Sequence, residues 1–242
     1  MNFVVGFKFS EKFGTTREHA IALLERAQTL GLIPYGMSFH VGSQASNVRA
    51  WAHGLGYIHD ALAHLKDVSG ITLDAIDIGG GFPCNHYSSS EQDFTLSDIA
   101  AETLASYNNL PYQPKLLLEP GRGMVACAGT LHARVIARIE RNEHTWLFLD
   151  AGVYNGLFET MAYQGSTRYR VTPMRQDFNA GEMMFALAGP TGDSPDVITR
   201  EVLLPEDIAP GDILVFHDVG AYSLVVTSAF NGFPKPAVRF VE

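Results

Sequence analysis

The chain has 242 residues, of which 46% are hydrophobic and 18% are charged. That balance excludes a disordered polypeptide or a small disulfide scaffold, and the length fits one large domain or two medium ones. The 17 basic residues are outnumbered by 26 acidic ones, so the formal net charge is −9. Because phosphate binding needs a basic surface, we expect no nucleic-acid partner and no membrane partner.

The cysteines and the N-terminal residues indicate the compartment. Cys84 and Cys127 are too few for a disulfide framework and suit a reducing environment. Lys8, Glu11 and Lys12 interrupt any apolar stretch near the N-terminus, so no signal peptide or membrane span is expected. We therefore expect a cytoplasmic protein.

The first half of the chain alternates helix and strand signals. Apolar residues recur at helical spacing in three stretches, and a short apolar run follows each of them. Strands separated by helices predict right-handed βαβ units and a parallel sheet. The expected helices are 17–30, 51–65 and 96–107, and the expected strands are 35–41, 73–78 and 115–118.

After about residue 123 the pattern becomes that of an all-β domain. From Leu131 to Ile139 apolar residues recur at every second position, which predicts a half-buried antiparallel strand. We therefore expect two domains, residues 1–122 and residues 123–242. The further expected strands are 146–149, 183–187, 197–203, 213–216, 223–226 and 237–241.

The α/β half is small for a barrel. At roughly 30 residues per βα unit it holds about four units, whereas a closed eight-stranded barrel takes roughly 250 residues. Composition and spacing alone leave two possibilities, a small open sheet or half of a barrel.

Polar loops follow the expected strands. A lone histidine at a strand end, such as His40, is more often structural than functional. Gly79–Gly81 follow the second strand and form either a flexible turn or an array of backbone N–H groups that converge on an anion. Glu119 ends the third strand, where its carboxylate needs either Arg122 or the protonated ring nitrogen of a ligand.

Six motifs follow one another along the chain. They are Ser38–Ser43 (Ser-Phe-His-Val-Gly-Ser), Asp77–Pro83 (Asp-Ile-Gly-Gly-Gly-Phe-Pro), Glu119–Arg122 (Glu-Pro-Gly-Arg), Gly189–Ser194 (Gly-Pro-Thr-Gly-Asp-Ser), Gly220–Tyr222 (Gly-Ala-Tyr) and Phe230–Phe233 (Phe-Asn-Gly-Phe). Taken alone, the fourth motif is a turn and the fifth is more often a core segment than a catalytic one. Together, in this order, they closely resemble the pyridoxal-phosphate-dependent ornithine, lysine, arginine and diaminopimelate decarboxylases, which have an alanine-racemase-like fold. The resemblance implies the C-terminal half of a TIM-like α/β barrel followed by the all-β domain.

The resemblance also assigns roles to the matching residues. His40 would stack on the pyridine ring of pyridoxal phosphate, and Glu119 would keep the pyridine nitrogen protonated. A protonated ring draws off the negative charge left on Cα when carbon dioxide departs. Asp193 would contact the distal amine of the substrate from the neighbouring subunit; with His40 and Glu119 it completes the candidate catalytic set, and no metal site is expected. The phosphate ligands would be Ser43, Gly79, Gly80, Gly81, Gly121, Arg122 and Tyr222.

The sequence departs from the family in its catalytic groups. Gly192 stands where the family has the cysteine that is expected to protonate Cα. The cofactor lysine is also missing, because none of the five lysines has the family context of an early barrel strand. Gln164 stands near Tyr163 where the family often carries an aspartate, which weakens the case for a diamine precursor, although Asp193 and the Phe-Asn-Gly-Phe segment still favour the ornithine and lysine branch.

These features predict a pyridoxal-phosphate-dependent decarboxylase of basic amino acids, a lyase of polyamine biosynthesis. We expect it to require an N-terminal complement that carries the lysine, and to form a homodimer or hetero-oligomer with a same-family protomer. The alternative is a catalytically inactive homologue that regulates a decarboxylase by protein binding. A racemase on the same fold is disfavoured by the Gly-Pro-Thr-Gly-Asp and Phe-Asn-Gly-Phe segments.

Overall fold

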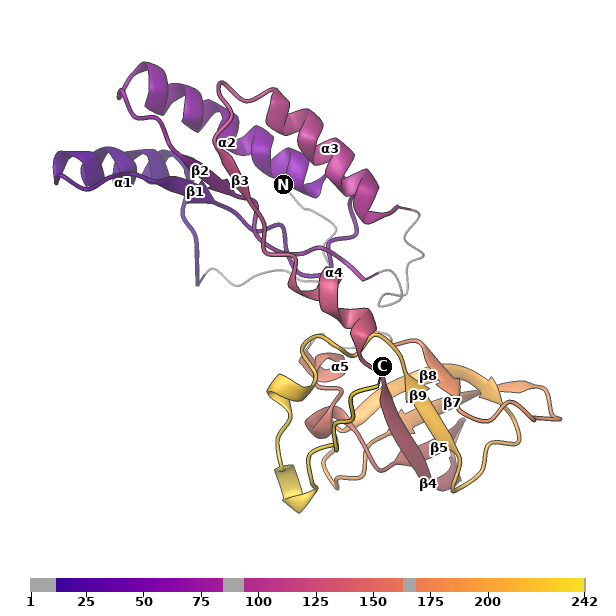
Figure 1. The fold of residues 1–242 in the computed structure, drawn as a ribbon. Coiled ribbons are helices and arrows are strands. Elements are labelled where there is room, and N and C mark those ends of the chain that lie inside the picture. The colour runs from indigo at the N-terminus through magenta and orange to yellow at the C-terminus, as the bar shows by residue number, and fades with distance from the viewer. Residues whose placement is uncertain (1–11, 85–93, 163–168, 242) are drawn as a thin grey trace. The chain divides into compact units, whose positions relative to one another are not determined.

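The computed structural model describes residues 12–84, 94–162 and 169–241. The chain divides into two compact units (Figure 1). The first unit comprises Met1–Pro83 and Gln92–Gly123, and the second comprises Cys84–Glu91 and Met124–Glu242. Within the described ranges no helix is both long and apolar enough to cross a membrane.

The first unit contains a three-stranded parallel sheet with strand order β1-β2-β3 (Figure 1). Gly36 pairs with Ala75 and Ala75 pairs with Lys115, so each strand lies beside the next one along the chain. The parallel α/β arrangement expected from the sequence is confirmed. Its elements are α1 (Arg17–Thr29), β1 (Gly36–Ser38), α2 (Ala50–Asp67), β2 (Ala75–Asp77), α3 (Leu96–Asn108) and β3 (Lys115–Leu117), and α4 (Gly121–Val125) begins at its end.

The core of the first unit is built on one face of α2. Its side chains Trp51, Leu55, Leu62 and Leu65 are fully buried and recur at helical spacing. In contrast, α1 has no buried residue. Its contacts with the α2 region include an ion pair between Arg17 and Asp60 at 3.0 Å.

The second unit contains a six-stranded sheet with strand order β6-β9-β4-β5-β7-β8 (Figure 1). The long strand β4 pairs antiparallel with both β5 and β9, as its period-two pattern predicted. The pair β5–β7 is parallel, so the sheet is mixed. The strands are β4 (Leu131–Arg141), β5 (His144–Leu149), β6 (Val171–Pro173), β7 (Glu182–Ala188), β8 (Val197–Pro205) and β9 (Ile213–Phe216).

Short helices interrupt this sheet, so the all-β character expected for the second unit is not confirmed. Among the described residues, the helix α5 (Glu159–Ala162) and four 3-10 turns lie outside the strands of the sheet. The turns are Ala126–Ala128, Val153–Asn155, Leu224–Val226 and Phe230–Gly232.

Two expected strands near the C-terminus are wrong. Residues 223–226 form a 3-10 turn in which Val226 N–H donates to the Ser223 carbonyl at 3.2 Å. Residues 237–241 form no strand, and Phe240 is 97% exposed. Apolar β-branched residues favour extended backbone, but a strand also needs a neighbouring strand to pair with.

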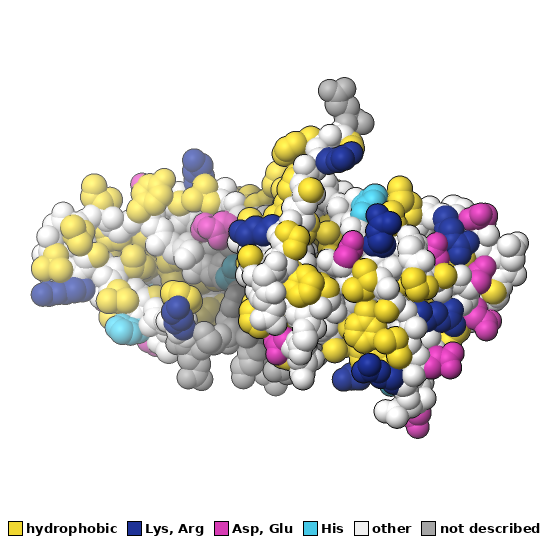
Figure 2. Space-filling view, turned by 90° about the horizontal axis from the view of Figure 1, so that it is seen from below, with side chains coloured by type: hydrophobic (Ala, Val, Ile, Leu, Met, Phe, Trp, Pro, Cys, Tyr) yellow, Lys and Arg dark blue, Asp and Glu magenta, His cyan; other side chains and the backbone are white. Residues whose placement is uncertain are grey.

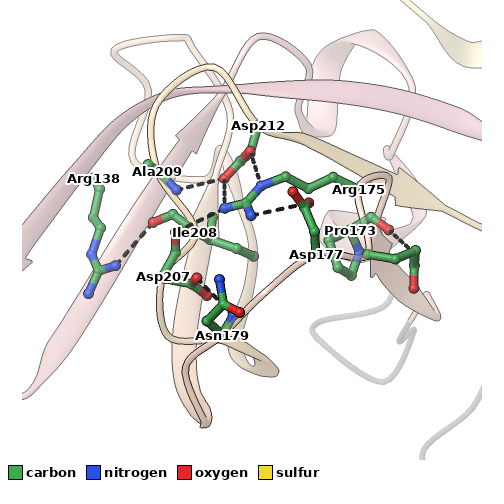
Figure 3. A network of polar contacts seen from close by, with 10 residues as sticks. Arg138, Pro173, Arg175, Asp177, Asn179, Asp207, Ile208, Ala209 and Asp212 are labelled. Carbon is green, nitrogen blue, oxygen red and sulfur yellow. Dashed lines mark hydrogen bonds and ion pairs between the residues drawn. The ribbon is translucent and has the colours of Figure 1, made fainter.

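Arg175 joins the segment that follows β6 to the turn that precedes β9 (Figure 3). Its guanidinium donates to both carboxylate oxygens of Asp212, with Nε–Oδ1 at 2.7 Å, and also to the Asp207 carbonyl. The Arg175 guanidinium lies 3.7 Å from the centre of the Phe178 ring. This two-pronged pairing is the strong form of an arginine–carboxylate contact, and it fixes the turn at residues 209–212.

The charges on the visible face are of both signs. Figure 2 shows Lys and Arg side chains interspersed with Asp and Glu side chains and with hydrophobic ones, without a continuous basic surface. In the full sequence, 26 acidic residues outnumber 17 basic ones.

Candidate functional site

The candidate residues of the first unit lie at one edge of its sheet. His40, Gly79 and Glu119 each come two residues after the end of β1, β2 and β3. Parallel strands bring their carboxyl ends to the same edge, where α/β proteins bind ligands. Because β2 is the central strand, its glycine loop lies between the other two loops.

Glycine is required throughout the loop after β2. Gly79 and Gly81 have φ angles of +67° and +93°. A Cβ atom on Gly79 would lie 2.3 Å from the Phe39 carbonyl oxygen. A Cβ on Gly80 would lie 2.9 Å from both His40 Nε2 and the Glu119 carbonyl oxygen. The loop therefore packs directly between the His40 and Glu119 segments, which excludes the flexible turn considered from the sequence.

Hydrogen bonds occupy all three carbonyl groups of this loop. Glu119 N–H donates to the Gly79 carbonyl at 3.0 Å, and Ala45 N–H donates to the Gly81 carbonyl at 2.9 Å. The indole N–H of Trp51 donates to the Gly80 carbonyl at 3.2 Å.

Two of the three amide N–H groups of the loop are left for a ligand. Gly79 N–H donates to Asp77 Oδ1 at 2.8 Å, whereas the N–H groups of Gly80 and Gly81 donate to no acceptor within the described part of the chain. Two such adjacent donors at a strand end suit an anion.

His40 presents a neutral ring at this edge. Its Nδ1 accepts a hydrogen bond of 3.0 Å from Gly42 N–H, so in the neutral ring the proton is on Nε2. Burial lowers the pKa of His40 below its ordinary value, although the charges of Glu119 and Asp77 oppose that shift. The ring is thus uncharged near neutral pH.

Glu119 and Arg122 do not pair with each other. The Glu119 side chain is exposed, while Arg122 is only 5% exposed, and no ion pair or hydrogen bond joins their side chains in the described ranges. Arg122 lies in the first turn of α4. The N–H of the preceding Gly121 donates a hydrogen bond of 2.9 Å to the Glu119 carbonyl. The internal ion pair considered from the sequence is therefore wrong, and the Glu119 carboxylate is available to a cation. Ser43 is half-buried in the loop after β1.

The second unit holds the other two candidates. The hydroxyl of Tyr154 donates a hydrogen bond to the Asp193 carboxylate. Tyr222 has a φ angle of 52° and is 50% exposed, and Asp218 before it has a φ angle of 60°. Two non-glycine residues with left-handed backbone so close together mark a strained loop, a feature that gathers at functional sites.

Three side-chain contacts that hold these sites together could not be predicted from the sequence. Trp51 and Asp77 fix the glycine loop, and Tyr154 binds Asp193. Trp51 was seen only as an apolar helix position, and no pattern signals a contact across 39 residues. Lys8, Tyr163 and Gln164, singled out above, lie outside the described residues.

The groups at the sheet edge fit one class of ligand. Two free N–H donors suit a phosphate, the neutral His40 ring suits stacking on a flat heteroaromatic ring, and the Glu119 carboxylate suits a protonated ring nitrogen. A pyridine ring that bears a phosphate has all three features.

Comparison with known proteins agrees with this fit. Residues 4–126 match the family described as pyridoxal-dependent decarboxylase, pyridoxal binding domain. The chain is 30% identical over 245 residues to the ornithine decarboxylase of Cricetulus griseus, covering 97% of this chain and 53% of that enzyme. It is 30% identical over 236 residues to the diaminopimelate decarboxylase of Archaeoglobus fulgidus, covering 96% and 54%.

A solved decarboxylase structure is also similar to this chain. The lysine/ornithine decarboxylase from Vibrio vulnificus, complexed with cadaverine, superposes with a TM-score of 0.82 at 33% identity, covering 95% of this chain and 61% of that one. The chain spans about half the length of the curated relatives it matches. On its motifs, its sheet edge and these similarities, the chain belongs to the pyridoxal-dependent decarboxylase family.

Proposed function

We propose that this chain is the C-terminal part of a pyridoxal-phosphate-dependent decarboxylase that converts a basic amino acid of the ornithine or lysine type into an amine and carbon dioxide. Residues 1–122 form half of the cofactor-binding α/β barrel and residues 123–242 form the C-terminal β domain. A polypeptide that carries the cofactor lysine completes the barrel. The enzyme belongs to polyamine biosynthesis.

The observation that carries this proposal is the position of Gly80. A Cβ atom at this position would lie 2.9 Å from both His40 Nε2 and the Glu119 carbonyl oxygen, so only glycine lets the loop pack against both segments. The loop thus brings an anion site, a neutral ring and a carboxylate to one edge of the sheet. A protein that only binds a partner has no need of that combination.

The residues divide into three roles. When bound, pyridoxal phosphate supplies an electron-accepting ring that stabilises the charge left on Cα as carbon dioxide departs. His40 packs on that ring, and the Glu119 carboxylate holds the proton on its nitrogen. Asp193 binds the distal ammonium group of the substrate, from the neighbouring protomer of a dimer. The phosphate is held in the first unit by Ser43, Gly79, Gly80, Gly81, Gly121 and Arg122, with the free N–H groups of Gly80 and Gly81 as backbone donors. The family resemblance assigns a further phosphate contact to Tyr222.

A catalytically inactive homologue that regulates a partner by binding is the second candidate. It is favoured by Gly192 in place of the proton-donating cysteine and by the positions of the described lysines. Lys115 begins β3, at the opposite end of that strand from Glu119. Lys66 lies near the end of α2, 5.9 Å from the centre of the Tyr112 ring.

The test compares residues 1–242 alone with the protein that also contains the completing polypeptide. Each is loaded with pyridoxal phosphate, reduced with borohydride and mapped by mass spectrometry for the modified lysine. We expect stoichiometric labelling only in the complete protein, on a lysine outside this chain, together with release of carbon dioxide from ornithine or lysine. Labelling of one lysine of the isolated chain with turnover would disprove the need for a complement. Labelling of the complete protein without turnover would support the regulatory candidate.

A further inference from the structure

Tyr154 connects two motifs that lie far apart in the sequence. Its hydroxyl donates to Oδ2 of Asp193, in the Gly-Pro-Thr-Gly-Asp loop. Its ring packs on the Phe230 ring of the Phe-Asn-Gly-Phe segment, with centroids 4.3 Å apart and planes inclined by 30°. All three residues belong to the second unit.

The backbone around Tyr154 is fixed from both sides. Its carbonyl accepts a hydrogen bond of 2.9 Å from Ser228 N–H. The preceding Val153 N–H donates to Oδ1 of Asp196 at 2.9 Å, and Asp196 is only 2% exposed. The turn that carries Phe230 is shaped by Asn231, whose φ angle is 53°. The phenol is therefore held in place before any ligand arrives.

The loop of Asp193 has its own anchors, which do not involve Tyr154. Oδ2 of Asp196 accepts from Thr191 N–H at 3.0 Å and from the Thr191 hydroxyl at 2.7 Å. Asp196 N–H donates to the Asp193 carbonyl at 3.0 Å. The backbone of the loop is thus set without the phenol, so the Tyr154 hydroxyl acts on the Asp193 side chain alone.

We propose that Tyr154 is a positioning residue for amine recognition, which orients the Asp193 carboxylate toward a distal ammonium group and is itself supported by Phe230. This inference rests on the proposed function and names how substrates with a distal amine are selected. With Oδ2 held by the phenol, the carboxylate has a single orientation and Oδ1 faces the ligand. The Phe-Asn-Gly-Phe segment thereby acquires a role in specificity.

The charge state of the pair agrees with this geometry. The hydrogen bond to Asp193 raises the pKa of Tyr154 above its ordinary value near 10, and the charges of Asp193 and Asp196 act in the same direction. The phenol therefore stays protonated and remains a donor through the physiological pH range.

The kinetic test uses Tyr154→Phe in the complete enzyme, because this variant keeps the ring on Phe230 and removes only the hydroxyl. We expect KM for ornithine or lysine to rise about tenfold while kcat changes less than about twofold. Inhibition by cadaverine should weaken to the same extent, whereas inhibition by n-pentylamine, which lacks the second amine, should not change. Phe230→Leu should give a smaller rise in KM.

Tyr107→Phe is the matched control, since it removes a hydroxyl that donates to the Pro114 carbonyl at 2.8 Å in the first unit. Its KM should equal that of the wild type. Equal losses for cadaverine and n-pentylamine in Tyr154→Phe, or an unchanged KM, would overturn the positioning role.

A second measurement does not depend on turnover. In the complete protein with 13Cζ-labelled tyrosine, the signal that Tyr154→Phe removes should titrate above the ordinary tyrosine range, and Asp193→Asn should lower its pKa. A Tyr154 signal with an ordinary pKa that Asp193→Asn leaves unmoved would refute the contact. If neither ornithine nor lysine is decarboxylated, the proposed function fails while this titration still decides whether Tyr154 holds Asp193.

Discussion

The indole N–H of Trp51 donates to the carbonyl of Gly80 at 3.2 Å, linking the first turn of α2 to the centre of the glycine loop. The same indole stacks on the Phe82 ring, with centroids 4.5 Å apart. Both contacts are made by a fully buried side chain. Trp51 therefore fixes the Gly80 carbonyl, which belongs to the same peptide group as the free N–H of Gly81.

Replacing Trp51 should weaken the binding of pyridoxal phosphate to the Gly79–Gly81 loop. Trp51→Phe leaves the Gly80 carbonyl without its donor and creates a small cavity, at a cost of about 1–3 kcal/mol in the free energy of unfolding. Because the Gly80 and Gly81 N–H groups lose their fixed direction, we expect pyridoxal phosphate to bind about tenfold more weakly, measured by absorbance titration. Trp146→Phe, in the second unit, is the control and should leave the affinity unchanged.

Neutralising Glu119 should separate catalysis from cofactor binding. In the complete enzyme, Glu119→Gln should lower turnover roughly a hundredfold or more, because an unprotonated pyridine ring stabilises the charge on Cα poorly. Cofactor content, measured by absorbance, should stay the same because the phosphate contacts persist. Glu102→Gln, on the surface of α3, is the matched control. Equal rates for Glu119→Gln and wild type would remove Glu119 from this role.

Restoring the family cysteine should improve the fidelity of the reaction. A Cβ atom on Gly192 would meet no atom within 4 Å, so the loop has open space where a side chain would begin. The new thiol supplies an acid for Cα, and the ratio of amine to side products should rise when both are quantified by chromatography. Gly181→Cys adds a thiol at another open position and should leave the ratio unchanged. An unchanged ratio for Gly192→Cys would mean that another group already donates the proton.

The stability contributed by Asp212 should depend on pH. Arg175 lowers the pKa of Asp212 below its ordinary value of 3.8, so the stabilisation is present above that value and is lost as the pH falls through the lower folded-state value. Asp212→Asn should reduce the free energy of unfolding by about 1–2 kcal/mol at pH 7. The difference should shrink below about pH 3.8, where Asp212 begins to be protonated in the unfolded chain.

Asp177→Asn is the matched control for that experiment. The free energy of unfolding of each variant is measured with a denaturant at pH 7 and below about pH 3.8. Asp177 pairs with the same arginine at 3.6 Å, but its side chain is 85% exposed, against 14% for Asp212. An exposed pair of this kind contributes little. Equal effects of the two substitutions would contradict the assignment of the stabilisation to the Asp212 pair.

Local patterns in the sequence were enough to predict most elements of the first unit. Helical spacing located α1, α2 and α3, and short apolar runs located β1, β2 and β3. Of the three strands, only the central strand β2 is mostly buried, as expected for a strand with neighbours on both sides. The parallel order then predicts that His40, Gly79 and Glu119 meet at one edge of the sheet. The positions of these three candidate residues therefore follow from periodicity and from the rule that the carboxyl ends of parallel strands lie at the same edge of a sheet.

The contacts that complete the candidate site were decided only by the tertiary structure. Trp51 and Gly80 are 29 residues apart, and Tyr154 and Asp193 are 39 apart. No spacing rule reaches that far, since such contacts depend on how elements pack. Residues 237–241 show the same limit: their side chains favour a strand, yet a strand forms only where another backbone pairs with it, and none among the described residues does so.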